Sequence, residues 1–424
     1  MSIKAKSCFC SALLALSSTI FAAGFSILEQ TPSGLGAALA GMTANTEEPS
    51  AIYFNPSATA WFDHPSFVMG THILTGDVRF HDNGKSTLSG RDSGDIVGTT
   101  LIPNFAAVYP VSDGLVLNLT MSATSGTETN YPKDWQGRYF AIDTSVAVIE
   151  IQPSIAYRIT DDLSIGVGFM AQYDDIIMRQ KLNTSRAGSD SELKLDGDTW
   201  AYGFTAGLTW KPFEKTTVGI GYRSKMRHDI SADARINRIP TLAQRMYGLA
   251  GSVYMDEADL TLDMPQSVNF GIVQQVTDNL KLMMDIAWTD WSEMDALTVK
   301  FKKGTLTGKK VSEKMLWHDS WRFAVGAEYK VNDKWTLRAG TAFDERTVTN
   351  HDTKTCKLPD SNRYWASCGV SYQFSEALRF DVSFTHLFFQ PSHINQRDSV
   401  SGQKLSGAFR GYTNLLSLGM RYDF

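Results

Sequence analysis

The last thirteen residues of the chain alternate between apolar and polar side chains with a period of two. One parity contains Tyr412, Leu416, Leu418, Met420, Tyr422 and Phe424, and the other contains Thr413, Ser417, Gly419, Arg421 and Asp423. Because successive side chains of a β-strand point to opposite faces, this pattern predicts a strand with one apolar and one polar face. Such a strand fits the wall of a transmembrane barrel, where lipid contacts the apolar face and an aqueous lumen contacts the polar face.

Short polar breaks recur along the chain and alternate strictly with long, polar, Gly-rich stretches. The short breaks fall at 111–113, 160–162, 212–215, 277–279, 332–333 and 375–377, and the long ones fall near 81–98, 126–145, 181–197, 232–257, 302–311, 347–362 and 391–410. Short turns on one side and long loops on the other are typical of an outer-membrane barrel, whose turns face the periplasm. The segments between the breaks predict an all-β fold of fourteen antiparallel strands, from 66–80 to 412–424.

The composition is compatible with a membrane barrel and argues against two other classes. Mean hydropathy is −0.19, as expected for a barrel whose polar lumen residues dilute its apolar outer face. Outside the N-terminus, no apolar run approaches the roughly 18 residues that a spanning helix needs. The formal net charge is −5, and an acidic protein is a poor candidate for binding nucleic acid.

The N-terminus has the organisation of a secretory signal peptide. Lys4 and Lys6 form a basic start, and residues 12–23 form a short apolar segment that ends in small side chains. We expect cleavage after Ala22, which makes residues 1–22 the signal peptide; the alternative is a first buried helix. A secreted barrel protein of this kind belongs in the outer membrane of a Gram-negative bacterium.

Residues 23–65 do not alternate and carry little charge. Their glycines, Gly34, Gly36 and Gly41, permit close packing of the backbone. A compact segment of this kind before the first strand predicts a plug, or hatch, inside the lumen, and the alternative is a tail in the periplasm. The predicted division of the chain is a signal peptide over 1–22, a hatch over 23–65 and a transmembrane barrel over 66–424.

Two cysteines, Cys356 and Cys368, follow the predicted signal peptide. A disulfide between them is one prediction for an oxidising compartment. Two unpaired cysteines are the alternative, because Cys356 falls in a loop and Cys368 has the parity of a lipid-facing residue. Aromatic residues near the predicted strand ends are typical of the girdles at the two membrane interfaces. This set comprises Trp200, Trp210, Tyr222, Trp288, Trp291 and Trp335.

An ordered series of motifs resembles the long-chain fatty acid outer-membrane transporters (FadL-like). The series includes Ser33-Gly-Leu-Gly, Asn55-Pro56-Ser57, Phe62-Asp-His-Pro-Ser-Phe67, Ile102-Pro-Asn104, Tyr222-Arg-Ser-Lys225, Thr261-Leu-Asp-Met-Pro265, Thr289-Asp-Trp-Ser292, Trp335-Thr-Leu-Arg-Ala-Gly-Thr-Ala-Phe-Asp344 and Pro359-Asp-Ser-Asn-Arg-Tyr-Trp365. The resemblance spans the whole mature chain and implies a monomeric, fourteen-stranded barrel with an N-terminal hatch that includes Asn55 and Pro56. One departure is Ser57, where the family usually has alanine.

The resemblance implies a passive channel for hydrophobic molecules, most of all long-chain fatty acids. Phe25 of the hatch is expected beside the ligand, and Arg179 and Lys314 are the expected partners of a carboxylate head group. Arg223 and Arg338 are alternatives inside the barrel. Each of these cations has a second interpretation, because a basic residue in the lumen also balances carboxylates such as Asp381 and Asp423.

The resemblance also implies that ligand leaves sideways through a kink in the third strand, with movement of the hatch. The predicted strand ends in the small residues Ala123, Thr124, Ser125 and Gly126, and glycine permits a bend. The alternative is a strand that simply runs into a loop there. We also expect contacts with outer-membrane lipid and lipopolysaccharide, and recognition of the terminal Phe424 by the barrel-assembly machinery.

Other functions are less consistent with the sequence. A barrel enzyme needs a nucleophile, histidine and acid together, but neither HExxH nor GxSxG occurs, and we predict no catalytic, metal or cofactor site. A barrel adhesin needs neither a hatch nor an apolar lumen. Within transport, a channel for aromatic hydrocarbons is the main alternative, since a neutral cargo requires no cationic partner.

Overall fold

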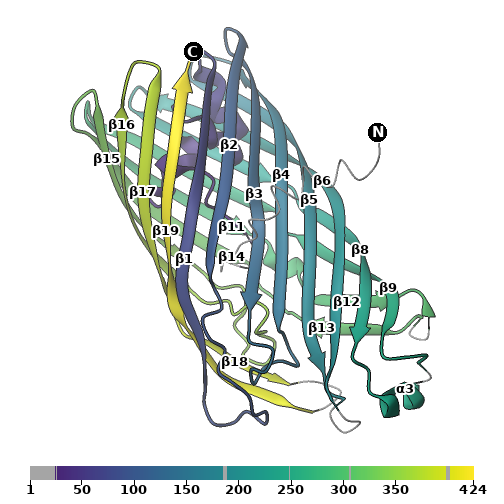
Figure 1. Cartoon of the computed structure of the whole chain (residues 1–424). Helices are drawn as coiled ribbons and strands as arrows, with labels where there is room; N and C mark the ends of the chain where they lie inside the picture. Colours follow the sequence, from purple (N-terminus) through teal and green to yellow (C-terminus); the bar gives the residue numbers. More distant parts are fainter. Residues whose placement is uncertain (1–23, 25, 185–188, 248, 305–306, 398–401) are drawn as a thin grey trace.

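A computed structural model of the chain describes residues 24, 26–184, 189–247, 249–304, 307–397 and 402–424. The predicted signal peptide over 1–22 and the predicted ligand contact Phe25 lie outside the described residues. The described chain forms one closed antiparallel barrel with a small helical segment inside it (Figure 1). None of the described helices has the length and apolar character that a membrane crossing requires.

The barrel wall consists of nineteen hydrogen-bonded segments that make fourteen crossings. Five crossings are interrupted and therefore carry two labels, namely β7/β8, β9/β10, β11/β12, β13/β14 and β17/β18. The sheet closes where β1 pairs with β19 along its whole length. The segments are β1 (Ser66–Asp82), β2 (Thr99–Ser112), β3 (Leu115–Asn130), β4 (Asp143–Arg158), β5 (Leu163–Leu182), β6 (Ser191–Phe213), β7 (Thr216–Arg223), β8 (Met226–Asn237), β9 (Tyr254–Met264), β10 (Ser267–Thr277), β11 (Leu280–Thr289), β12 (Ala296–Phe301), β13 (Lys310–Lys314), β14 (Ser320–Lys330), β15 (Trp335–Asp344), β16 (Arg363–Gln373), β17 (Leu378–Phe389), β18 (Ser392–Arg397) and β19 (Lys404–Asp423).

The predicted alternation of faces is confirmed along the wall. In β19 the side chain of Leu418 is 42% exposed, whereas that of its neighbour Ser417 is fully buried. In β19, therefore, apolar side chains face outward and small polar side chains face inward, as in the membrane wall of a barrel. A period of two also runs through β8, where every second residue from Met226 to Ala234 is buried, but there the exposed residues are polar or charged and most of the buried ones are apolar.

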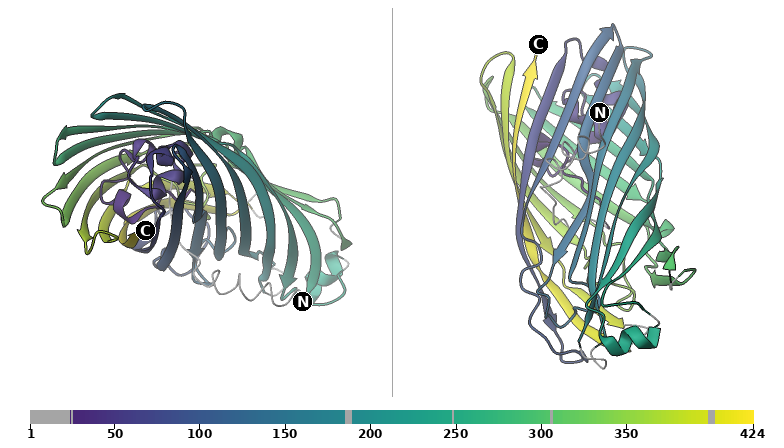
Figure 2. Two further views of the ribbon diagram at one scale, coloured as in Figure 1. Left: turned by 90° about the horizontal axis from the view of Figure 1, so that it is seen from above. Right: turned by 45° about the vertical axis from the view of Figure 1, so that its right-hand side comes forward.

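Residues 24–65 lie inside the barrel at the end where the short turns and the C-terminus are found. Figure 2, seen from above, shows this purple segment enclosed by the wall. Its elements are α2 (Pro32–Leu35) and the 3-10 turns η1 (Met42–Ala44), η2 (Pro49–Tyr53) and η3 (Pro56–Trp61). The hatch is therefore inside the lumen, and the alternative of a periplasmic tail was wrong. Two further short elements, α3 (Thr241–Tyr247) and the 3-10 turn η5 (Trp291–Glu293), lie outside the hatch.

Asn55 is the main polar link between the hatch and the wall. Its side-chain amide donates to the carbonyl of Thr43 at 2.8 Å and to the hydroxyl of Thr209 at 2.9 Å, and its oxygen caps η3 by accepting from the amide of Ser57. The hydroxyl of Ser57 adds two hydrogen bonds of 2.7 Å, to Asn55 and to Thr209. The serine at this position therefore contributes bonds that an alanine could not make.

Wall glycines let the hatch backbone approach the sheet. A Cβ atom at Gly207 would overlap the Asn55 side chain, and one at Gly221 would overlap the carbonyl oxygen of Phe54. Gly36 of the hatch and Gly369 of β16 meet backbone to backbone in the same way. The hatch is thus seated on a strip of wall that has no side chains.

Of the two possibilities for the cysteines, the unpaired one is found: Cys356 and Cys368 both carry free thiols, because Cys356 is buried in an external loop while Cys368 is exposed on the outer face of β16. One prediction about an individual residue was wrong. Trp291 is fully buried instead of lying in an aromatic girdle, since the chain turns inward at η5. Trp200, Trp210 and Trp335 are exposed on the outer face, as the prediction of girdles requires.

The glycine strip gives a first prediction. We expect Gly221→Ala to lower the stability of the folded barrel by about 1–3 kcal/mol, because the added methyl group displaces the Phe54 carbonyl and overpacks the contact. The measurement is the thermal unfolding midpoint in detergent. Ala339→Val, on the outer face of β15, is the matched control and leaves the midpoint unchanged. Equal midpoints for both variants would contradict the close seating of the hatch.

Candidate functional site

A central cavity lies between the hatch and the surrounding barrel wall and has a volume of about 80 Å³. Its apolar lining comes from separate parts of the chain: the hatch, the β8–β9 hairpin and η5. Its polar lining includes Arg223 and Arg322. The larger apolar members are Leu28, Phe54, Met226, Met264 and Trp291, while serine, threonine, asparagine and glutamine side chains and Asp344 complete the polar part. A pocket that joins an apolar side to a polar, charged side can hold a molecule with an apolar body and a polar end.

The predicted kink in β3 forms one wall of this cavity. The pairing of β3 with β4 shifts register between Ala123 and Ser125, so Thr124 is the extra residue of a β-bulge. The pairing of β3 with β2 ends at Ser122, although both strands continue beyond that point. A β-bulge bends the strand and leaves its neighbours locally unpaired.

The hatch occupies the place that β2 leaves free. Ser26 forms a bridge with Ser125, and the amide of Ile27 donates to the carbonyl of Thr124 at 2.9 Å. The side chain of Gln30 donates to the carbonyl of Ala123 at 2.6 Å. At Gly126 an added Cβ would press on the side chain of Ile27. The start of the hatch therefore closes the β2–β3 gap, defined as the unpaired stretch beyond Ser122.

Gly24 packs on the far side of the cavity. Its backbone has a positive φ of 64°, and a Cβ atom here would overlap the ring of Trp291. Trp291 in turn meets Trp317 edge to face, with ring centroids 5.1 Å apart. The first described residue of the hatch is thus held against an aromatic pair in the opposite wall.

Arg223 lies inside the barrel, as the sequence suggested, but its charge is already matched. Its guanidinium donates to both carboxylate oxygens of Glu150 at 2.6 Å and to Gln152 at 2.7 Å. It also stacks over the ring of Tyr53 at 4.2 Å. A charge-assisted pair of this kind is strong, and because Arg223 also donates to the carbonyl of Tyr53, it ties the wall to the hatch.

Arg322 of β14 is the less constrained cation at the cavity. One guanidinium nitrogen donates to the hatch carbonyl of Ala38 at 2.6 Å, and the group lies 4.8 Å from the ring of Trp365. Its Nε is buried and has no partner among the described residues. The carboxylates of Asp344, Asp285 and Glu29 all act on its charge.

Glu29 places a carboxyl group of the hatch within range of this cation. The side chain is 1% exposed. Burial raises the pKa of Glu29 to about 7, although backbone amides and the charges of Arg363 and Arg322 act in the opposite direction. The protonation state of this hatch residue therefore changes near neutral pH.

The sequence-predicted cations lie elsewhere. Arg179 has the parity of the lipid-facing Val167 and Phe169 of β5 and pairs with Asp143 at 2.9 Å on the outer face. Lys314 is exposed, while its neighbour Glu313 points inward. Neither cation belongs to the lining of the central cavity, so their contact with a ligand stays a prediction. Arg338, the other alternative, lies inside and pairs with Glu328 at 2.7 Å.

A second, smaller cavity of about 30 Å³ lies toward the external loops. Lys357 and Glu313 form an ion pair of 2.6 Å in its lining. The apolar lining residues are Val146, Ile176, Met178, Leu262, Leu297, Met315 and Leu358. Like the central cavity, this site joins an apolar interior to a charged group.

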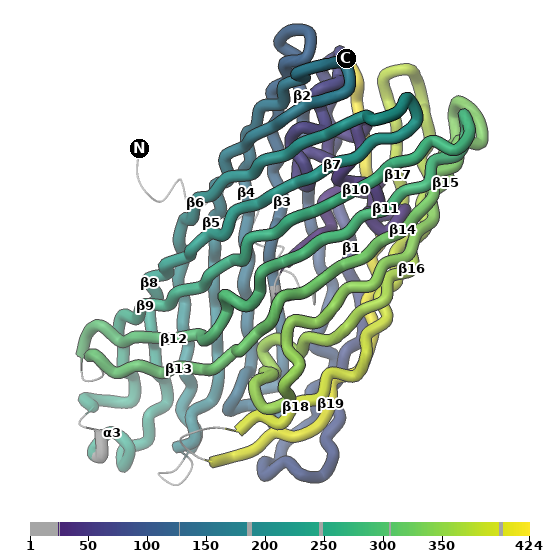
Figure 3. Tube along the Cα trace, turned by 180° about the vertical axis from the view of Figure 1, so that it is seen from behind, coloured from purple at the N-terminus to yellow at the C-terminus, as the bar shows by residue number. Residues whose placement is uncertain are grey.

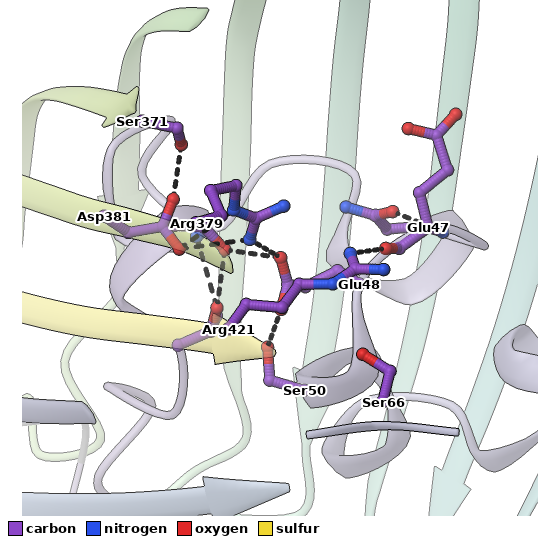
Figure 4. Close-up of polar contacts among 12 residues, drawn as sticks. Glu47, Glu48, Ser50, Ser66, Ser371, Arg379, Asp381 and Arg421 are labelled. Atoms are coloured by element: carbon purple, nitrogen blue, oxygen red, sulfur yellow. Dashed lines mark hydrogen bonds and ion pairs between the residues drawn. The ribbon is translucent and has the colours of Figure 1, made fainter. Parts of the chain in front are cut away.

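The periplasmic end of the lumen has the opposite character. Figure 4 shows Glu48 of the hatch held by Arg379, at 2.6 Å, which also pairs with Asp381 at 3.0 Å. Burial alone would raise the pKa of Glu48, but the charges of Arg379 and Arg421 outweigh it and lower the pKa to about 2. The vestibule beside this cluster, about 880 Å³, is lined mainly by charged and polar residues. An apolar molecule would gain little there.

Sequence reasoning missed the two residues that define the central cavity. Trp291 falls in the break of alternation at Thr289-Asp-Trp-Ser292, which is the one sequence signal that the strand is interrupted. Arg322 shares the inward parity of Ala324 in β14, so alternation identifies it as a lumen residue. Nothing in the sequence gives its distance from the hatch.

Comparison with known proteins agrees with this geometry. The family "Outer membrane protein transport protein (OMPP1/FadL/TodX)" matches residues 13–424. A relative in Escherichia coli O6:H1, "Long-chain fatty acid transport protein", is 27% identical and the match covers 99% of this chain and 98% of that protein. Outer membrane protein P1 of Haemophilus influenzae is 26% identical over 95% of both chains.

Solved structures show the same fold. A Pseudomonas aeruginosa FadL homologue superposes with a TM-score of 0.87 at 25% identity, over 95% of this chain and all of that one. The Pseudomonas putida toluene transporter TodX gives a TM-score of 0.69 at 17% identity, over 94% of this chain and 99% of that one.

The fold and the cavity define an outer-membrane transport barrel for hydrophobic molecules. The chain belongs to the OMPP1/FadL/TodX family of outer-membrane transport proteins. It is therefore a transport channel of the Gram-negative outer membrane, and its family consists of channels and not enzymes.

The buried carboxyl group of the hatch gives a second prediction. Because the folded-state pKa of Glu29 lies near 7, above its ordinary value, ionisation costs stability as pH rises from about 4.5 to 7. Glu29→Gln should therefore raise the unfolding free energy at pH 8, by up to about 3 kcal/mol, and change nothing at pH 4. Thermal unfolding across this range measures the difference. If the difference in unfolding free energy between Glu29→Gln and the wild type did not vary with pH, the assignment of Glu29 as a buried carboxyl group with a raised pKa would be contradicted.

Proposed function

We propose that the protein takes up long-chain fatty acids across the outer membrane. The observation that supports this function most strongly is the central cavity, which is lined partly by the hatch and joins an apolar side, with Leu28, Met264 and Trp291, to a polar side with the guanidinium of Arg322. The curated relatives named long-chain fatty acid transport proteins match over nearly the full chain. The proposal assigns to this cavity an acyl tail and, at Arg322, a carboxylate.

Burial of the tail supplies most of the binding free energy. Each buried CH₂ group contributes about 0.8 kcal/mol, so a sixteen-carbon tail has on the order of 12 kcal/mol available before ordering costs. A hydrogen bond to a charged group such as the buried guanidinium of Arg322 contributes about 1.5–3 kcal/mol. The head group therefore sets the orientation of the cargo and adds a smaller share of the affinity than the tail does.

The cavity volume implies that the described state is closed. At about 80 Å³ the cavity is smaller than the roughly 150 Å³ that holds a single benzene ring in an engineered protein. An acyl chain therefore requires the lining to move. Ser26 and Leu28 of the hatch belong to that lining, and Met226 and Met264 are flexible side chains that can repack.

Release through the β2–β3 gap follows from the same movement. The gap is closed by the bridge between Ser26 and Ser125 and by the hydrogen bonds of Ile27 and Gln30. A tail that displaces residues 26–28 would break these contacts and open the wall beside Thr124. The charged periplasmic vestibule gives apolar cargo no comparable gain, so sideways release into lipid is favoured.

Aromatic hydrocarbons are the second candidate cargo. Three carboxylates, those of Asp344, Asp285 and Glu29, act on the charge of Arg322. They compensate part of that charge, whereas a dedicated anion site would leave the charge available to the ligand. A neutral cargo would need no such site. This candidate would share the cavity and the gap but would make no use of Arg322.

Three further assignments accompany the proposal. The barrel functions as a monomer in contact with lipid and lipopolysaccharide. Phe424 is 72% exposed and adjoins the rings of Phe67 and Tyr422, an arrangement that leaves it accessible to the assembly machinery. Phe25 follows Gly24, which packs on Trp291, and its proposed role is contact with the ligand.

A binding titration separates the cargo candidates. For purified Arg322→Gln we expect oleate affinity to fall about 10-fold to 100-fold, since a hydrogen bond to a charged group is worth about 1.5–3 kcal/mol, while toluene binding stays within 2-fold. The same titrations are run on Arg179→Gln and Lys314→Gln. Loss of oleate binding in those two variants alone would move the head-group site to the outer face and overturn the role of Arg322.

A further inference from the structure

The wall has a second interruption, on the side opposite the β2–β3 gap. The pairing of β10 with β11 ends at Ser267 and Thr289, and pairing resumes only where Leu260 of β9 meets Val299 of β12. Between these points the described chain shows one backbone bond across the seam, from the amide of Asp290 to the carbonyl of Gln266 at 3.0 Å. We call the unpaired region formed by residues 261–265 and 291–298 the side window.

Figure 3 views this side of the barrel, where a bent segment joins β11 to β12. The bend contains η5, which carries Trp291 into the lumen. The two edges of the side window differ in length, so the ladder cannot simply continue across it. The side window is therefore an irregularity of the β-bulge kind, with ordinary strand pairing on its periplasmic and extracellular sides.

Apolar, flexible side chains fill the side window from the inside. Met264 and Leu262 project inward from one edge, and Trp291, Met294 and Leu297 come from the other. Met315 and Trp317 are buried behind them. Methionine adapts its shape at little cost, so the side chains of Met264, Met294 and Met315 can repack to let the filling move.

The side window adjoins both cavities. Met264 and Trp291 line the central cavity, while Leu262 and Leu297 line the smaller one. Across the lumen, the hydroxyl of Ser125 lies 3.8 Å from the sulfur of Met264. The side window and the β3 bulge therefore face each other across the central cavity.

The aromatic residues on its periplasmic side give the position of the side window along the membrane normal. Trp288 and Trp321 are register partners at its periplasmic edge, and Trp321 is 44% exposed on the outer face. Beyond this pair the outer face is polar, as shown by the exposed ion pair of Lys225 and Glu293. Aromatic girdles mark the edge of the hydrocarbon, so the side window, which lies beyond this pair, is at the level of the outer head groups.

We infer that the side window is a port through which hydrophobic cargo passes from the outer head-group layer into the central cavity. Cargo would then cross the lumen from the side window to the β2–β3 gap, without travelling along the barrel axis. This inference rests on transport of hydrophobic molecules by the chain and holds for acyl and aromatic cargo alike. The site takes a slender apolar molecule, because its filling is apolar and regular pairing on either side limits its width.

Covalent closure of the side window tests the port. Thr261 and Thr298 would be the next register pair after Leu260 and Val299, and a disulfide in Thr261→Cys/Thr298→Cys joins the two edges. Native Cys356 and Cys368 are first replaced by serine. The matched control is Asp259→Cys/Lys300→Cys, a pair in the regular ladder just beyond the side window. Uptake of oleate and of toluene into liposomes is measured, with cross-linking confirmed on gels.

We expect oxidation to lower the uptake of both cargoes at least tenfold in the window pair, with recovery on reduction, and to leave the control pair unchanged. Normal uptake by the cross-linked window pair overturns the port. If the disulfide does not form, Leu297→Trp is used to fill the side window instead. Uptake at the wild-type rate by that variant would also overturn the port. Failure of the wild-type protein to take up oleate while it takes up toluene would reject the fatty-acid proposal and leave the port standing.

Discussion

Backbone hydrogen bonding is the constraint on which the rest of this structure depends. A strand in lipid must pair on both sides, because water is absent and each unpaired group costs several kcal/mol. The pairing of β1 with β19 meets this requirement by closing the sheet. Against that background, two of the places where pairing stops, beyond Ser122 and between β9 and β12, are the notable parts of the wall because both border the central cavity.

The hatch divides the interior of the closed barrel into separate compartments. Wall glycines such as Gly207 and Gly221 seat its backbone, and Asn55 and Arg223 fix it with hydrogen bonds. The first residues of the hatch bond to β3 where β2 does not, and Glu48 anchors the periplasmic side of the hatch in a charged cluster. One short segment therefore closes the gap, forms the inner face of the cavity and separates the apolar cavity from the charged vestibule.

Much of the wall could be predicted from the sequence, because a period of two is enforced wherever one face meets lipid and the other a lumen. The same period also indicates that Arg179 faces outward, since it shares the parity of Val167 and Phe169. For Lys314 the period was no guide, because the interruption between β13 and β14 resets it. The burial of Trp291 and the distance between Arg322 and Glu29 depend on contacts between remote segments, which a single sequence does not encode locally.

The position of bound cargo tests this account most directly. A crystal structure of the protein with a fatty acid brominated along its tail would locate the bromine by its anomalous signal. The account predicts a peak in the central cavity, between Leu28 of the hatch and Trp291 of the wall, with the carboxylate toward Arg322. A peak in the periplasmic vestibule, beside Glu47 and Lys281, would contradict it.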